Sequence, residues 1–385
     1  MLGDLVSSSN VCSLPWIHTE IDLQSHTIKP CCKYNVIAGH ISETFPIVWF
    51  DKLADLRKKF INNDPIPECS ACEVPDNAFS YKKWKNKIYD NAGFLNTNEN
   101  NIELPKIFHI TLKNTCNLAC RMCYPNNSTK LDKLIKKSEI LMKLYSPADT
   151  PRISIESLKG SFVNARHITI VGGEPLIDKD CIKLIEMVKC ESPNLRSVTF
   201  SSNFVKLNYS LLEQLSNLDA KIQFNISLDG TKSIHEYIRY GCNWENIIKN
   251  IIFVKANYPK IKFAINSTIS ALNVGYVVEM LTTFHELEIE LGVKFTGHMS
   301  SPVLDPAYLH PGILPDNIKQ LYLEKLKSVD VSKFTIPESA NMIPTAISLL
   351  NTESDKLPLF KVFIDEFDKI AGTNLRLTYP EFNNI

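Results

Sequence analysis

The sequence has no long hydrophobic run and no excess of charge of either sign. A membrane-spanning helix needs roughly 18 or more consecutive apolar residues, and no such run occurs in the 385 residues. The segment Met1–Ser7 has no basic stretch followed by an apolar one, so we expect no secretory signal. The 42 basic and 42 acidic residues give no net charge, which argues against electrostatic attraction to nucleic acid. We therefore expect neither a membrane nor nucleic acid as a partner.

The sequence does contain many cysteines, 11 in all. Disulfides are not expected, because nothing marks the chain as secreted. Reduced thiols and metal ligation both suit the cytoplasm, which is the expected location.

Three of the cysteines form a short motif, Cys-x-x-x-Cys-x-x-Cys, at Cys116, Cys120 and Cys123. A [4Fe–4S] cluster is usually held by four cysteines, so a loop that supplies three leaves one iron open. An open metal position is where a metal site performs chemistry. Two alternatives remain: three zinc ligands with a remote fourth, or small hydrophobic residues that happen to cluster. We favour the open cluster.

The segments around this motif place it in a loop. Apolar residues alternate in Ile107–Lys113, which predicts a strand, and residues 128–145 have helical spacing. The cysteines therefore follow the C-terminal end of a strand, which is the catalytic face of a parallel α/β barrel.

The same alternation of strand and helix continues along the chain and argues for a parallel sheet. Further strands are predicted at 167–171, 197–201, 221–226, 262–267 and 293–296, and helices at 180–190, 209–215, 246–257 and 274–287.

Two further motifs follow these strands. Gly172-Gly-Glu-Pro175 follows the second strand, and Ser227-Leu-Asp-Gly230 follows the fourth, with His235–Arg239 just beyond it. With the three-cysteine loop, these segments resemble the radical S-adenosylmethionine (SAM) enzymes. The resemblance implies a partial (β/α)6 TIM-like barrel over residues 105–300, a three-cysteine [4Fe–4S] cluster and SAM. The residues that it assigns to SAM are Met122, Gly172, Gly173, Glu174, Ser202, Asn203, Ser227, Asp229 and Arg239.

The resemblance also implies a role for most of these residues. The segment 172–174 would contact the SAM amino group, and its glycines would let the backbone approach the ligand closely. Ser227 and Arg239 would hold the carboxylate, which suits the planar fork of a guanidinium. Residues 202–203 would lie near the ribose, and Met122 beside the cluster and the adenine.

A second group of cysteines lies in the first 72 residues: Cys12, Cys31, Cys32, Cys69 and Cys72. A Cys-x-x-Cys with two more cysteines can close a structural zinc site or a fully ligated [4Fe–4S] cluster. A cysteine before Pro-Trp, a Pro-Cys, a helix with a tryptophan (49–61) and Cys-x-x-Cys together resemble the SPASM/Twitch auxiliary-cluster module. That module usually follows the barrel and has a glycine where this chain has residues 24–26. The resemblance implies an auxiliary [4Fe–4S] cluster on Cys12, Cys31, Cys69 and Cys72, with Cys31 favoured over Cys32 because it directly follows proline.

We therefore expect four parts in the chain. They are an auxiliary-cluster module (1–87), a linker (88–104), the barrel (105–300) and a C-terminal helical extension (301–385). Helices at 316–328 and 359–370 are expected to close the open side of the barrel. The remaining cysteines, Cys181, Cys190 and Cys242, are expected to be buried structural thiols.

The function implied by the resemblance is reductive cleavage of SAM to a 5′-deoxyadenosyl radical that abstracts hydrogen from a substrate. A single set of auxiliary ligands resembles Twitch, which favours a small polar substrate such as a sugar or a nucleotide-like compound; peptide or protein modification is the alternative. An external electron donor such as flavodoxin or ferredoxin is expected. A non-catalytic cluster or zinc scaffold is a more distant alternative. His298 is a candidate substrate contact, although a hydrogen-bonded structural role is favoured.

Overall fold

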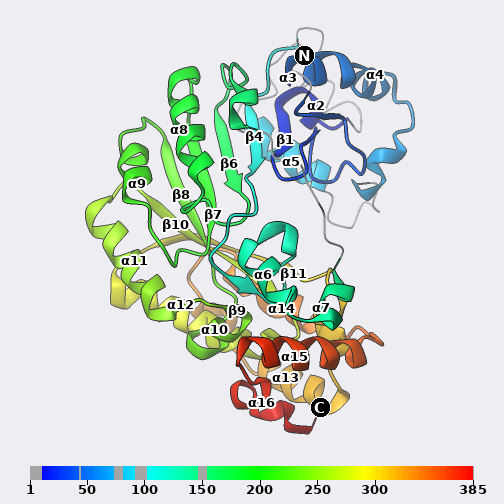
Figure 1. Cartoon of the computed structure of the whole chain (residues 1–385), viewed down its shortest axis with the longest axis vertical. Helices are drawn as coiled ribbons and strands as arrows, with labels where there is room; N and C mark the ends of the chain where they lie inside the picture. Colours follow the sequence, from blue (N-terminus) through cyan, green and yellow to red (C-terminus); the bar gives the residue numbers. More distant parts are fainter. Residues whose placement is uncertain (1–10, 43–44, 73–80, 92–101, 146–153, 385) are drawn as a thin grey trace.

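A long, mostly parallel sheet organises the molecule (Figure 1). The structure is a computed structural model and describes residues 11–42, 45–72, 81–91, 102–145 and 154–384. Nine strands pair in the order β11-β10-β8-β7-β6-β4-β1-β2-β3, and within the described residues the two ends of this order do not pair with each other. The sheet is therefore open.

Six strands form the barrel part of the sheet, and each is parallel to its neighbours. They are β4 (Ile107–Thr111), β6 (His167–Val171), β7 (Ser197–Ser202), β8 (Lys221–Ser227), β10 (Lys262–Ile269) and β11 (Phe295–Pro302). This arrangement confirms the predicted α/β class and is consistent with a partial TIM-like barrel.

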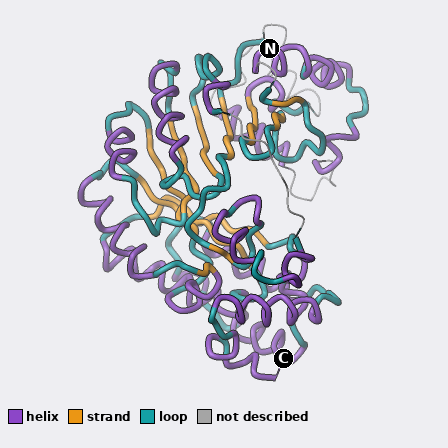
Figure 2. The backbone as a smooth tube through the Cα atoms, in the orientation of Figure 1, coloured by secondary structure: helices purple, strands orange, loops and turns teal. Residues whose placement is uncertain are grey.

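Helices connect these strands and cover one side of the sheet (Figure 2). They are α6 (Thr129–Ile135), α7 (Glu139–Leu144), α8 (Lys179–Glu191), α9 (Tyr209–Ser216), α10 (Lys232–Ile238), α11 (Trp244–Asn257) and α12 (Val277–Leu291). The predicted helix 128–145 is two helices, because the Ser138 side chain accepts a hydrogen bond from the Leu141 N–H and starts a new one.

Alternating burial along the strands separates the two faces of the sheet. In β4, Phe108 and Ile110 are fully buried, whereas His109 and Thr111 are half-buried. The buried face contains close aromatic contacts, such as Phe108–Phe162 with ring centroids 4.9 Å apart. The core therefore lies on one face, and the other face carries the partly accessible side chains.

The N-terminal segment continues this sheet. Its strands are β1 (His18–Asp22), β2 (Thr27–Lys29) and β3 (Gly39–His40), and its helices are α2 (Leu14–Ile17), α3 (Phe45–Ile47), α4 (Ala54–Asn62) and α5 (Tyr81–Asn91). Strand β1 is parallel to β4 and antiparallel to β2. The β1–β2 turn holds His26 at φ 60°, a left-handed conformation that usually favours glycine. Helix α5 continues past residue 87, where we expected the auxiliary-cluster module to end and the linker to follow.

The C-terminal region is helical, as expected from its sequence. Its helices are α13 (Asp316–Lys327), α14 (Met342–Leu350), α15 (Leu357–Ala371) and α16 (Leu375–Thr378). Helix α15 buries Phe360, Phe363 and Phe367 and packs on α6 and α7, the two helices that follow the cysteine loop (Figure 1). No helix in the described part of the chain combines the length and apolar character needed to cross a membrane.

Candidate functional site

The three-cysteine loop connects β4 to α6 and is fixed by a short antiparallel ribbon. Within the loop, β5 (Ala119–Cys120) pairs with β9 (Arg239–Tyr240), so that Cys120 lies opposite Arg239. The Cys116 N–H also donates to Thr129 Oγ1 at 3.3 Å. These bonds bring the cysteine motif and Arg239, which are far apart in the sequence, to one place.

The three thiols lie close enough to influence one another. Burial raises the pKa of Cys120 well above its usual value, and negative charge on Cys123 or Cys116 would raise it further. Burial raises the pKa of Cys123 to about 11, whereas the positive charge of Arg239 lowers the pKa of each of the three. The free thiols are therefore protonated at neutral pH, and metal binding would displace their protons.

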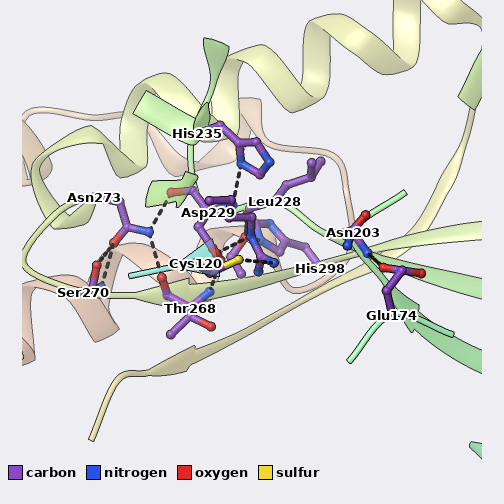
Figure 3. A network of polar contacts seen from close by, with 12 residues as sticks. Cys120, Glu174, Asn203, Leu228, Asp229, His235, Thr268, Ser270, Asn273 and His298 are labelled. Atoms are coloured by element: carbon purple, nitrogen blue, oxygen red, sulfur yellow. Dashed lines mark hydrogen bonds and ion pairs between the residues drawn. The ribbon is translucent and has the colours of Figure 1, made fainter. Parts of the chain in front are cut away.

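Arg239 is held by a buried ion pair. Its Nε lies 2.6 Å from Asp229 Oδ2, and its Nη1 lies 3.9 Å from Cys120 Sγ. Figure 3 shows Asp229 at the centre of a network that also contains Cys120 and Thr268. The other Asp229 oxygen accepts from the Thr268 N–H at 2.7 Å, and Asn273 donates to the Asp229 carbonyl at 2.8 Å. Asp229 thus fixes the direction of the guanidinium toward the cysteine loop.

The glycines after β6 have a packing role. A Cβ atom on Gly173 would lie 2.4 Å from Thr115 O, and one on Gly172, which has φ 137°, would lie 2.9 Å from Leu112 N. The backbone of the Gly172–Glu174 segment also bonds to the start of the cysteine loop, since the Glu174 N–H donates to Thr115 O at 2.8 Å. We expected these glycines to admit a ligand; the structure adds that they admit the cysteine loop.

Glu174 gathers two other predicted residues around its buried carboxylate (Figure 3). It accepts from Ser202 Oγ at 2.7 Å, from the Asn203 N–H at 2.6 Å and from the Leu176 N–H at 3.0 Å. Burial raises the pKa of Glu174 to about 7, and these hydrogen bonds oppose that shift. The Asn203 side chain reaches the cysteine loop, donating to Asn117 Oδ1 at 3.0 Å.

Most of the residues predicted for SAM therefore lie around one loop. Ser227 ends β8, half-buried beside Asn266 of β10, and Met122 is half-buried within the cysteine loop. Sequence reasoning missed Asn117, Asn273 and Thr268. Only Asn117 carried a signal, since it directly follows Cys116 in the motif.

The structure decides the expected role of His298 and corrects the expected burial of Cys190. His298 is 1% exposed, and its two ring nitrogens lie 2.8 Å from Ser267 Oγ and 3.0 Å from Ser339 Oγ. It is therefore the hydrogen-bonded structural residue and not a substrate contact. Cys190, predicted to be buried, is exposed because it lies on the outer face of α8, whereas Cys181 on the same helix is fully buried.

The N-terminal cysteines form a second group. Cys12 and Cys31 are buried, Cys69 and Cys72 are half-buried, and Cys32 is exposed. Burial raises the pKa of Cys12, and negative charge on Cys31, Cys69 or Cys72 would raise it further, so the four thiols are neighbours.

Among the described residues, no three His, Cys, Asp or Glu side chains are arranged so that they could hold a single metal ion. The thiols of both groups are soft donors, a type that suits iron–sulfur clusters and zinc alike.

Comparison with known proteins agrees with this geometry. Residues 110–272 match the model of the Radical SAM superfamily. The chain is 31% identical over 159 residues to molybdenum cofactor biosynthesis protein 1 of Drosophila melanogaster, covering 40% of this chain and 25% of that protein. It is 26% identical over 178 residues to an S-adenosylmethionine-dependent nucleotide dehydratase of Psychrobacter lutiphocae, covering 45% and 58%.

A solved structure also matches: Streptococcus suis SuiB bound to S-adenosylmethionine, at 14% identity and a TM-score of 0.37, over 90% of this chain and 69% of that one. The chain spans about a quarter to three fifths of the length of the curated relatives named above. The loop, ion pair and glycine segment described above all lie within residues 110–272, the part of the chain that is similar to the Radical SAM superfamily.

Proposed function

We propose that this protein cleaves SAM reductively at a [4Fe–4S] cluster held by Cys116, Cys120 and Cys123, and that it acts on a small polar substrate. When bound, the cluster and SAM would supply the radical chemistry. One electron from a donor such as flavodoxin or ferredoxin would split SAM into methionine and a 5′-deoxyadenosyl radical, which would take a hydrogen atom from the substrate and leave a substrate radical.

The observation that carries this proposal is the convergence of three other chain segments on the cysteine loop. The loop contacts the Gly172–Glu174 segment through Thr115, Asn203 through Asn117, and Arg239 through Cys120. Soft ligands, a cation and hydrogen-bonding groups thus come together at the C-terminal ends of the strands, which is the catalytic face of a parallel α/β barrel.

Each group has a role that its contacts allow. Arg239 donates from Nε to Asp229 and from Nη1 to Cys120 Sγ, so we assign its Nη2 to a carboxylate. Both carboxylate oxygens of Glu174 already accept hydrogen bonds from the protein, and its carbonyl accepts from the Ile177 N–H at 3.2 Å. We therefore assign the SAM amino group to the backbone carbonyls of Gly172 and Gly173. Ser202 and Asn203 are assigned to the ribose, Ser227 to the carboxylate and Met122 to the adenine side.

The accessible face of the sheet supports a small polar substrate. His109, Thr169, Thr199 and Gln223 are half-buried and lie opposite one another in a row across four neighbouring strands. Hydrogen-bonding side chains in such a row suit a ligand with several polar groups. The name of one relative, a SAM-dependent nucleotide dehydratase, agrees with a nucleotide-like compound.

We assign the N-terminal cysteines to an auxiliary [4Fe–4S] cluster on Cys12, Cys31, Cys69 and Cys72. The support is their proximity and the burial of Cys31 where Cys32 is exposed. His18 Nδ1, 2.8 Å from Pro30 O, fixes the backbone just before Cys31. A cluster ligated by four cysteines has no iron left for substrate, so its role would be electron transfer.

Anaerobic reconstitution followed by dithionite and SAM tests the proposal. We expect methionine and 5′-deoxyadenosine in equal amounts, and about eight irons per chain, from four in each cubane. The Cys116/Cys120/Cys123→Ala variant should hold about four irons and form no 5′-deoxyadenosine, while Cys190→Ala, which removes an exposed thiol, should match the natural protein. If the iron-loaded natural protein forms no 5′-deoxyadenosine, the proposal that it cleaves SAM reductively is wrong.

The substrate needs a separate experiment. Incubation with nucleotides, sugars and small peptides, with uncoupled 5′-deoxyadenosine formation as the baseline, should show stimulation by the nucleotide or sugar class. Stimulation by peptides alone would replace the small-molecule assignment with peptide modification.

A further inference from the structure

The cysteine loop contacts the C-terminal helix α15 through one buried side chain of the loop, Arg121. Arg121 lies between Cys120 and Cys123, and its side chain has no solvent exposure. Its Nη2 donates to Asp368 Oδ1 of α15 at 2.5 Å and to Thr373 Oγ1 at 2.7 Å. An arginine in a loop assigned to metal binding is therefore directed into the C-terminal region.

Aromatic rings enclose this guanidinium. Its central carbon lies 3.5 Å from the ring centroid of Tyr237 on α10 and 4.4 Å from that of Phe367 on α15. Its Nη1 donates to the Tyr237 carbonyl, and the Arg121 backbone N–H donates to Ile238 O at 2.9 Å. The loop, the segment that leads to Arg239 and α15 are thus joined at one point.

Asp368 is itself fixed by several donors. Its carboxylate accepts from Tyr237 Oη at 3.1 Å, from the Leu375 N–H at 2.6 Å and from Thr373 Oγ1 at 2.5 Å, besides Arg121. A carboxylate held this firmly is a rigid anchor for its partner.

We propose that Arg121 and Asp368 form a positioning pair, through which the C-terminal region sets the backbone of the cysteine loop so that its three thiolates hold a cluster and keep one iron open. The proposal rests on the proposed function. It adds that the cluster site depends on a helix outside the matched radical SAM domain, which ends at residue 272.

The physical argument is one of rigidity. A loop that supplies three ligands has one fewer tether than a loop that supplies four, so the groups behind the ligands must restrict its backbone. The Arg121 side chain stacks on Tyr237 and Phe367 and ends at Asp368, which assigns it a positioning role and no contact with the reacting atoms.

Asp368→Asn tests the pair, with Glu366→Gln as the matched control. Glu366 lies on the same helix and accepts from Ser138 Oγ at 2.8 Å, so it ties α15 to α7 and not to the cysteine loop. We expect Asp368→Asn to release about four irons to a chelator roughly tenfold faster than the natural protein, as loss of a supporting partner typically does. Glu366→Gln should release iron at the natural rate.

A double variant separates positioning from the cost of an unpaired buried charge. Arg121→Met/Asp368→Asn removes both charges and keeps an apolar side chain of similar length. If positioning is the role, the double variant should still release iron fast. Arg121→Lys, which keeps the charge, should release iron more slowly than the double variant but faster than the natural protein. Recovery of natural retention in the double variant would overturn the proposal.

Two readouts tie the effect to the cysteine loop. The SAM-induced change in the electron paramagnetic resonance spectrum reports the open cluster alone, and it should weaken in Asp368→Asn but not in Glu366→Gln. Hydrogen exchange of the metal-free proteins needs no cluster, and residues 118–124 should exchange faster only in the Arg121 and Asp368 variants. Unchanged exchange there would overturn the proposal.

The same measurements keep the two proposals apart. If the natural protein binds no iron at the three cysteines, the proposed function fails, while hydrogen exchange still tests the pair. If the natural protein forms 5′-deoxyadenosine but the Asp368 variants behave like Glu366→Gln, only the positioning role fails.

Discussion

Replacing Gly173 with alanine should displace the cysteine loop. The added Cβ would lie 2.4 Å from Thr115 O and 2.8 Å from the carbonyl carbon of Asn114, although separations below 3.0 Å essentially do not occur. The two segments must therefore move apart by at least about 0.6 Å. Both contacts are to backbone atoms, so no side chain can rotate away. Because Thr115 directly precedes Cys116, the movement passes to the first of the three proposed cluster ligands.

The cost follows from the contacts that would be lost. The Gly173 N–H donates to Lys113 O at 3.1 Å, and the Glu174 N–H donates to Thr115 O at 2.8 Å. Two backbone hydrogen bonds contribute about 1 kcal/mol each. Overpacking adds typically 1–3 kcal/mol, so we expect Gly173→Ala to lose roughly 3–5 kcal/mol of stability. The thermal midpoint of the metal-free protein and the iron content after reconstitution should both fall.

Gly297→Ala is the control for this substitution. A Cβ there would meet only the flexible end of Glu338, at 3.0 Å from its Oε2 atom, so it should change the midpoint and the iron content little. If Gly173→Ala matched Gly297→Ala in both measurements, the inference that this glycine admits the cysteine loop would be wrong.

Three further predictions concern other parts of the molecule. Asp229→Asn leaves Arg239 without its buried partner, which typically costs about 3–5 kcal/mol of stability. The thermal midpoint and the SAM affinity measured by calorimetry should therefore both fall. An unchanged affinity would contradict the assignment of Arg239 to the SAM carboxylate. Cys31→Ser should lose about four irons and Cys32→Ser none, and the reverse result would exchange the assignment. Burial lowers the pKa of His298 to about 4, so on acidification this imidazole is protonated in the unfolded chain before it is protonated in the folded protein. The free energy of unfolding should therefore fall by roughly 3 kcal/mol as the pH drops from about 6.5 to 4. Urea unfolding of His298→Gln should show a flatter pH dependence.

The barrel strands could be predicted because burial repeats every second residue along them. The predicted 167–171 coincides with β6, and the predicted 197–201 falls one residue short of β7. Strand β11 was predicted at 293–296 but occupies Phe295–Pro302, since Ser300 and Ser301 break the apolar alternation. Helix α14 was missed because Pro344 argues against a helix. In the structure that proline lies in the first turn, where its missing N–H costs nothing.

The cysteine motif and the glycine segment could be predicted as well, because the order of residue types along a short segment defines them. The groups that support them could not. Arg121 and Asp368 are 247 residues apart, and nothing in the local sequence of either predicts the other. The pairing of β1 with β4 was missed for the same reason, because sequence patterns define elements and leave their long-range partners open.

Both ends of the chain support the region where the proposed chemistry would occur. The β1–β2 turn contacts the start of the cysteine loop, where the Asn114 N–H donates to Gln24 Oε1 at 3.1 Å, and α15 contacts its middle through Arg121. The two loop residues lie on either side of Cys116, and their partners, Gln24 and Asp368, lie outside the segment that the family model matches. Because a three-ligand cluster loop must be held firmly and still leave one iron accessible, its rigidity has to come from groups that do not bind the metal. The N-terminal strands and the C-terminal helix supply such groups, so truncation at either end should impair cluster binding even though every assigned ligand of the open cluster remains.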